Sequence, residues 1–139
     1  MTSNRTHRVA RDRFRVFLDR AEDLSRTMHR SLSEGDVNGA GLAAIHCAIA
    51  ASDALTTFHL EERSTGQDHS EATRLVRRLP VEGWETFLTH LESALSEKSS
   101  VEYEAKIVSP KQAAALVLAA DRALRWARKQ LPSPRTGPR

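Results

Sequence analysis

The fold of this chain is decided by residues 43–58, which read AAIHCAIAASDALTTF. Apolar side chains occupy nearly every side of a helix with this sequence, and the alanines allow neighbouring helices to approach closely. We therefore expect a helix from about Ala40 to Glu62 that is covered on nearly all sides. In a chain of 139 residues, such coverage predicts packing against the first, fourth and fifth helices of the chain and against a second subunit.

Outside this helix, apolar residues at helical spacing and strong punctuation signals predict four more helices. Glycines break the chain over residues 34–39. Asp68 and Glu71 form one capping-box pattern, and Ser109-Pro110-Lys111-Gln112 forms another. The expected helices span residues 9–33, 40–62, 68–79, 82–97 and 110–131, with an extended link over 101–107.

Length and composition predict one all-α domain over residues 9–131, with flexible ends over 1–8 and 132–139. No uninterrupted apolar run approaches the roughly 20 residues that a membrane span requires. The first residues lack the apolar segment of a secretory signal, and Cys47 is the only cysteine. These features predict a cytoplasmic protein without a disulfide and without membrane attachment.

Charge is distributed unevenly along the chain, although the net charge is only +3. Residues 1–30 carry a balance of +4, residues 31–121 a balance of −7, and residues 122–139 a balance of +6. Basic ends are compatible with an anionic polymer such as RNA, but Arg-rich helix faces and tails are more often simply solvated.

The clearest candidate site is the stretch 63–69, which reads RSTGQDH and joins two of the expected helices. Arg63 offers a planar fork of donors to phosphate oxygens, and His69 can move a proton near neutral pH. Their plain alternatives are a helix C-terminal arginine and a surface histidine beside a cap. Asp68 is an N-cap that could also orient a ring or an arginine.

On the apolar helix, three polar residues recur on one stripe: His46, Asp53 and Thr57. Such a stripe either lines a cleft or faces water. Asp53 lies nearest the Arg63 end and is the candidate supporting residue from this helix.

The sequence contains no pattern that is typical of a metal or cofactor site. A di-metal helical bundle requires Glu-x-x-His, and no histidine has a glutamate three residues before it. There is no zinc-type cysteine or histidine pair, and the glycines match neither a P-loop nor a dinucleotide fingerprint. We therefore expect neither a metal nor a cofactor.

The order of these features resembles the HEPN superfamily of small helical bundles from bacterial toxin–antitoxin and RNA-processing systems. The resemblance is carried by the R-x(4–6)-H signature at the junction of the second and third helices, here Arg63 and His69 with five residues between them. The alanine-rich helix, Tyr103 and the Ser109-Pro110 helix start support it.

The resemblance implies an up-and-down bundle of four or five helices that pairs as a homodimer. It also implies a metal-independent endoribonuclease in which the RNA's own 2′-hydroxyl attacks the neighbouring phosphodiester. His69 would then act as general acid/base or orient the 2′-hydroxyl, and Arg63 would stabilise charge on the phosphate, with Ser64, Asp68 and Asp53 in support. An antitoxin protein is a further implied partner.

Two positions depart from the family pattern. Ser64 follows the arginine, where active members often carry Asn, Asp or His, and Glu71 stands where nucleotidylated toxins carry tyrosine. The alternative function is a non-catalytic dimeric module that binds a nucleotide, RNA or a protein partner.

Overall fold

The centre of the structure is the apolar helix α2, which spans Val37–Leu60 and buries more than half of its residues. The computed structural model describes residues 6–65, 69–97 and 108–133. The other helices within these ranges are η1 (Arg11–Arg13), α1 (Phe14–Ser33), α3 (His69–Val76), α4 (Trp84–Leu95) and α6 (Pro110–Lys129). The predicted all-α bundle is therefore confirmed at the level of a mostly helical fold, to which a two-stranded sheet is added.

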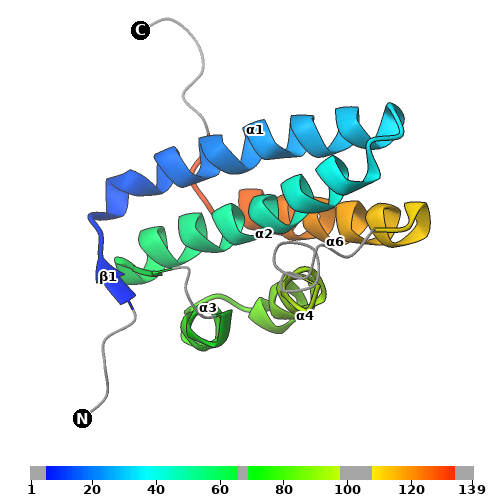
Figure 1. The fold of residues 1–139 in the computed structure, drawn as a ribbon. Helices are drawn as coiled ribbons and strands as arrows, with labels where there is room; N and C mark the ends of the chain where they lie inside the picture. The colour runs from blue at the N-terminus through cyan, green and yellow to red at the C-terminus, as the bar shows by residue number, and fades with distance from the viewer. Residues whose placement is uncertain (1–5, 66–68, 98–107, 134–139) are drawn as a thin grey trace, which may run out of the picture.

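Three long helices lie along one another, and two shorter ones cross them. Figure 1 shows α1 and α6 flanking α2, while α3 and α4 are seen nearly end-on below it. All four of these helices contact α2. The arrangement thus differs from a simple up-and-down array, because α3 and α4 close the bundle at an angle.

By length and mean hydropathy (1.3), α2 could cross a membrane, contrary to the expectation that no segment approaches this property. However, 78% of its most apolar window is buried inside the protein. This burial is typical of the core helix of a soluble protein, because apolar residues on all sides are covered by neighbouring helices.

The break between α1 and α2 is shorter than the six residues predicted. α1 ends at Ser33, and Asp36 already caps α2 by accepting a hydrogen bond from the Gly39 nitrogen at 3.0 Å. Gly35 lies in the turn with a φ of +80°, a conformation that favours glycine. The side-chain hydrogen bond of Asp36 therefore draws residues 37–39 into the helix.

The capping box at the start of α6 forms as predicted. The Ser109 hydroxyl accepts a hydrogen bond from the Gln112 nitrogen, and the Gln112 side chain accepts one from the Ser109 nitrogen. The predicted link over 101–107 lies outside the described residues. Just after it, the Val108 nitrogen donates to the Asn38 side chain at 3.1 Å, which joins the starts of α2 and α6.

The sheet pairs β1 (Thr6–Arg8) with β2 (Glu62–Ser64) in antiparallel register. Two expectations require correction here. Residues 6–8 form a strand instead of part of a flexible end, and the helix expected to reach Glu62 ends at Leu60. Glu61 adopts a left-handed conformation with a φ of 57°, which ends α2 and turns the chain into β2.

Candidate functional site

Arg63 lies in strand β2, not at the end of a helix as the sequence predicts. Its guanidinium carbon stands 4.9 Å from the centre of the Phe17 ring on α1. Its Nη1 lies 3.8 Å from Oδ2 of Asp53 on α2. The side chain is 31% exposed, so solvent reaches a guanidinium that two helices hold in place.

Asp53 is the buried acid of this end of the molecule, with only 8% of the residue exposed. Burial raises the pKa of its carboxyl to about 7, and the charges of Arg63 and Arg20 oppose part of that rise. The carboxyl therefore exchanges its proton near neutral pH. The structure thus brings together Asp53 of α2 and Arg63 of β2, which the sequence links only by the position of Asp53 near the end of the helix.

A second guanidinium stands near the same ring, since that of Arg20 lies 5.5 Å from the centre of Phe17. Phe17 and the buried Asp53 thus have two cations beside them, one from α1 and one from β2. Two guanidiniums that flank one ring provide donors for an anionic group.

The same pattern recurs nearby, at the start of α1 and the end of α2. Arg11 lies over Phe58 at 5.7 Å, and Arg15 lies over Phe14 at 4.7 Å. The rings of Phe14 and Phe58 contact each other edge to face, with centroids 5.1 Å apart. We call this set the Arg–Phe cluster; its members are Arg11, Arg15, Arg20, Arg63, Phe14, Phe17 and Phe58.

Some members of the Arg–Phe cluster also have structural hydrogen bonds. Arg11 donates through Nε to the Phe58 carbonyl at 2.6 Å. Arg15 donates to the carbonyls of Pro132 and Ser133 at 3.3 and 3.2 Å, which fastens the chain after α6 to α1. The cluster is therefore preorganised, because ring contacts and backbone acceptors fix its cations.

Of the three remaining predicted site residues, only Ser64 has a side chain within the described part of the chain. Ser64 follows Arg63 in β2 and is buried, with 5% of the residue exposed. Asp68 lies outside the described residues. His69 is the first residue of α3, as the helix junction predicts, but its side chain is outside the described part of the chain.

The polar stripe predicted on α2 divides between two environments. His46 is exposed, whereas Thr57 is fully buried. His46 and Asp53 line a hollow of about 420 Å³ between α1 and α2, together with Arg20, Asp23, Leu24, Ile49 and Ala50. The first part of the stripe thus lines a groove. Thr57 lies in the core, and its hydroxyl has no hydrogen-bond partner among the described residues.

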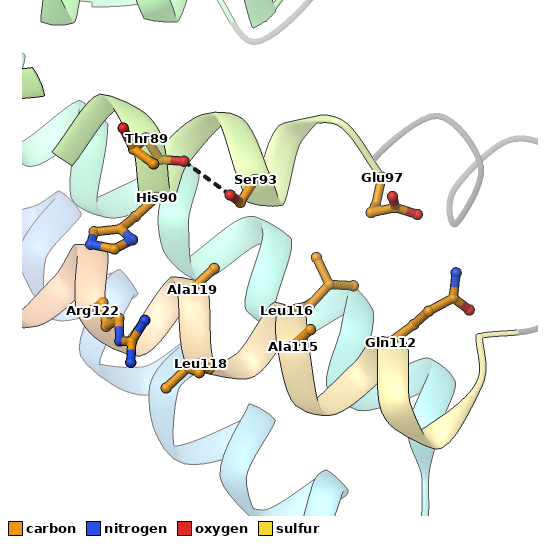
Figure 2. A pocket seen from close by; sticks show the side chains of 10 residues that line it. All are labelled: Thr89, His90, Ser93, Glu97, Gln112, Ala115, Leu116, Leu118, Ala119 and Arg122. Atoms are coloured by element: carbon orange, nitrogen blue, oxygen red, sulfur yellow. Dashed lines mark hydrogen bonds between the residues drawn. The ribbon is translucent and has the colours of Figure 1, made fainter. Parts of the chain in front are cut away.

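A second hollow, of about 410 Å³, lies between α4 and α6 and has no counterpart in the sequence predictions (Figure 2). His90 and Arg122 face each other at one end, and Glu97 and Gln112 lie at the other. Burial, and then the charge of Arg122, lowers the pKa of His90. The hydroxyls of Thr89 and Ser93 donate to carbonyls of their own helix, which makes them poor donors to a ligand. The sequence does contain a signal for this hollow that the predictions missed, because Thr89, His90 and Ser93 recur at helical spacing.

Within the described ranges, no group of three or more His, Cys, Asp or Glu side chains could hold a metal ion. Cys47 is buried in α2, and its thiol lies 3.4 Å from the Ala21 carbonyl. Burial raises the pKa of this thiol to about 12, so it stays protonated and unreactive.

Comparisons of the chain with known protein families, with characterised proteins and with solved structures find no match.

Proposed function

We propose that this protein is a metal-independent, HEPN-like endoribonuclease that binds an RNA phosphodiester at Arg63. One observation carries the proposal. The Arg63 guanidinium is held between the Phe17 ring and the buried Asp53 carboxyl, and the side chain remains 31% exposed. Arg63 also belongs to the strand that precedes His69 in the chain. The cations of the Arg–Phe cluster extend this positive surface toward the start of α1.

The reaction uses groups that the chain itself supplies. The RNA 2′-hydroxyl loses its proton to a base and attacks the neighbouring phosphorus, and the 5′-oxygen leaves with a proton. Arg63 stabilises the negative charge that grows on the phosphate oxygens. His69 transfers the proton, as imidazoles do near neutral pH.

Asp53 fits this chemistry as a positioning residue for Arg63. A carboxylate 3.8 Å away directs the guanidinium and partly neutralises it. Because its pKa is about 7, a lower pH protonates Asp53 and weakens its hold on the arginine. Ser64 and Asp68 are supporting residues in the same proposal.

Two copies of the chain complete the cleft in the proposed enzyme. A homodimer would bring two Arg63–His69 pairs to one groove, and a basic groove of this kind suits single-stranded RNA. An acidic antitoxin protein would be a second type of partner for the same surface. The proposed setting is the bacterial cytoplasm.

One observation favours the alternative of a non-catalytic binding module. The Arg63 guanidinium already has a carboxyl, an aromatic ring and the Ser64 carbonyl within reach, the last at 3.4 Å. An arginine with this many internal contacts can serve to hold β2 against the helices. In that case the chain binds a nucleotide, RNA or a protein without cutting it.

The test is cleavage of single-stranded RNA of mixed sequence by the purified full-length chain in the presence of a chelator. Arg63→Ala and His69→Ala are each expected to lower the cleavage rate at least about 100-fold. Far-ultraviolet circular dichroism checks that both variants stay folded.

Two matched substitutions serve as controls. Arg26→Ala removes an exposed arginine of α1 that pairs with Asp23, and His29→Ala removes an exposed histidine that pairs with Asp121. Both variants should cleave as the unmodified chain does. Equal rates in all five proteins would falsify the nuclease, whereas RNA binding without cleavage would support the non-catalytic module.

A further inference from the structure

The register of the two-stranded sheet places a histidine beside Arg63. In the antiparallel pair, His7 of β1 lies directly opposite Arg63 of β2. Directly opposite residues point to the same face of a sheet, with Cβ atoms about 4.5–5.5 Å apart. His7 is 56 residues away in sequence, so no local motif links the two.

The side chains confirm which residues share each face. The Thr6 hydroxyl donates to the Glu62 carboxylate at 3.2 Å, and Arg8 lies directly opposite Glu62 in the register of the pair. Glu62 also pairs with Arg78, just beyond α3, at 2.8 Å. Thr6, Arg8 and Glu62 therefore lie on one face, and strand alternation leaves His7 and Arg63 on the other.

The face that carries His7 and Arg63 is the one directed toward Phe17 and Asp53. His7 is exposed, and Arg63 is partly exposed. Both groups are therefore accessible to a ligand at this face, where Asp53 and Phe17 also contact the guanidinium.

We propose that His7 and Arg63 form a cross-strand clamp that binds a phosphodiester of single-stranded RNA. This inference rests on the proposed function and deepens it, because it adds a ligand-binding residue that the Arg63–His69 motif lacks. Arg63 presents its planar fork to two phosphate oxygens of the RNA, and the His7 ring donates an N–H to a third acceptor on the same RNA strand. β1 then serves to deliver His7 to the site.

The experiment measures binding separately from cleavage. Its probe is a fluorescent single-stranded RNA with 2′-O-methyl groups at every position, which has no free 2′-hydroxyl to attack the phosphodiester. Fluorescence anisotropy gives the affinity of the full-length chain at several salt concentrations and mildly acidic pH, where imidazoles carry charge.

His7→Ala is expected to weaken binding at least about 5-fold and to reduce the dependence of log affinity on log salt by up to about 0.7, the value for one contact to a single strand. His7→Lys should restore most of the affinity and most of its dependence on salt. The matched control is Arg8→Ala, which removes an exposed cation from the same strand but from the opposite face, and it should change affinity less than about 2-fold.

Three outcomes would overturn the clamp: no binding by the unmodified chain, equal binding by His7→Ala, or an equal loss in Arg8→Ala. Failure of the proposed function is separate from these. If unmodified RNA stays intact while His7→Ala still loses affinity for the probe, the clamp stands and the chain is a binding module.

Discussion

The middle of α2 and its C-terminal end bury their residues in different ways. Between Ala43 and Ala51 the buried side chains are small or aliphatic and pack directly against α1 and α6. From Asp53 to Leu60 the same helix carries a buried carboxyl, two buried threonines and Phe58, a member of the Arg–Phe cluster.

Within this one helix, the middle contributes stability, whereas the C-terminal end carries residues of the candidate site. In the middle, small and aliphatic side chains pack closely, and the burial of their apolar area stabilises the fold. At the end, burial costs free energy for Asp53 and for the hydroxyls of Thr56 and Thr57, which have no hydrogen-bond partner in the described part of the chain. We infer that the middle supports the end, because a marginally stable chain tolerates such costs only where packing elsewhere offsets them.

The largest expected effect comes from a cavity in the middle of α2. Ile45 is fully buried, and Ile45→Ala should lower the free energy of unfolding by about 2–5 kcal/mol in chemical denaturation. The control is Leu42→Ala on the same helix, where the side chain is 37% exposed and the loss should be clearly smaller. Equal losses at the two positions would contradict the distinction between core and surface on α2.

The next effect concerns the pH dependence of stability at the C-terminal end. The folded pKa of Asp53, about 7, lies above its ordinary value, so the folded state holds an extra proton between about pH 4 and pH 7. The free energy of unfolding should therefore fall as pH rises through this window and stay level above it. The full shift corresponds to at most about 4 kcal/mol.

Asp53→Asn should remove this contribution, so the variant gains stability relative to the unmodified chain as pH rises from about 4 to 8. Denaturation at both ends of that range measures the gain. A constant difference between the two proteins across the range would show that Asp53 titrates as an exposed carboxyl does.

The smallest effect is expected at the surface of the Arg–Phe cluster. Arg11 is 53% exposed, pairs with Glu61 at 3.8 Å and donates to the Phe58 carbonyl. Arg11→Ala should cost less than about 1 kcal/mol, because solvent and salt screen an exposed pair. A loss comparable to that of Ile45→Ala would mean that this end, too, is essential to the fold.

Local patterns in the sequence predict the helices well, because each depends on neighbouring residues. The apolar stripe of α1, the Ser109–Gln112 capping box and the burial of α2 all follow from spacing and side-chain chemistry. The strand β1 could not be predicted in this way. Thr6-His7-Arg8 contains no apolar residue, and its pairing depends on a segment more than fifty positions away.

The same contrast between local and long-range contacts applies to the candidate site. The proximity of Asp53 to the Arg63 end follows from their positions on and just after one helix, and the structure places their charged groups 3.8 Å apart. The Phe17 ring, Arg20 and His7 come from distant segments, so no short motif could identify them. The role of His69 stays a prediction.

The left-handed backbone of Glu61 has a consequence for how such a site could arise or be lost. Had α2 continued, the Cα atoms of Asp53 and Arg63 would be separated by roughly 15 Å along the helix axis. Because the chain reverses direction at Glu61, the charged groups of Asp53 and Arg63 lie only 3.8 Å apart. Since a non-glycine residue resists this conformation by about 1–2 kcal/mol, a glycine at position 61 would ease the reversal, and a β-branched residue there would misdirect the guanidinium without touching it.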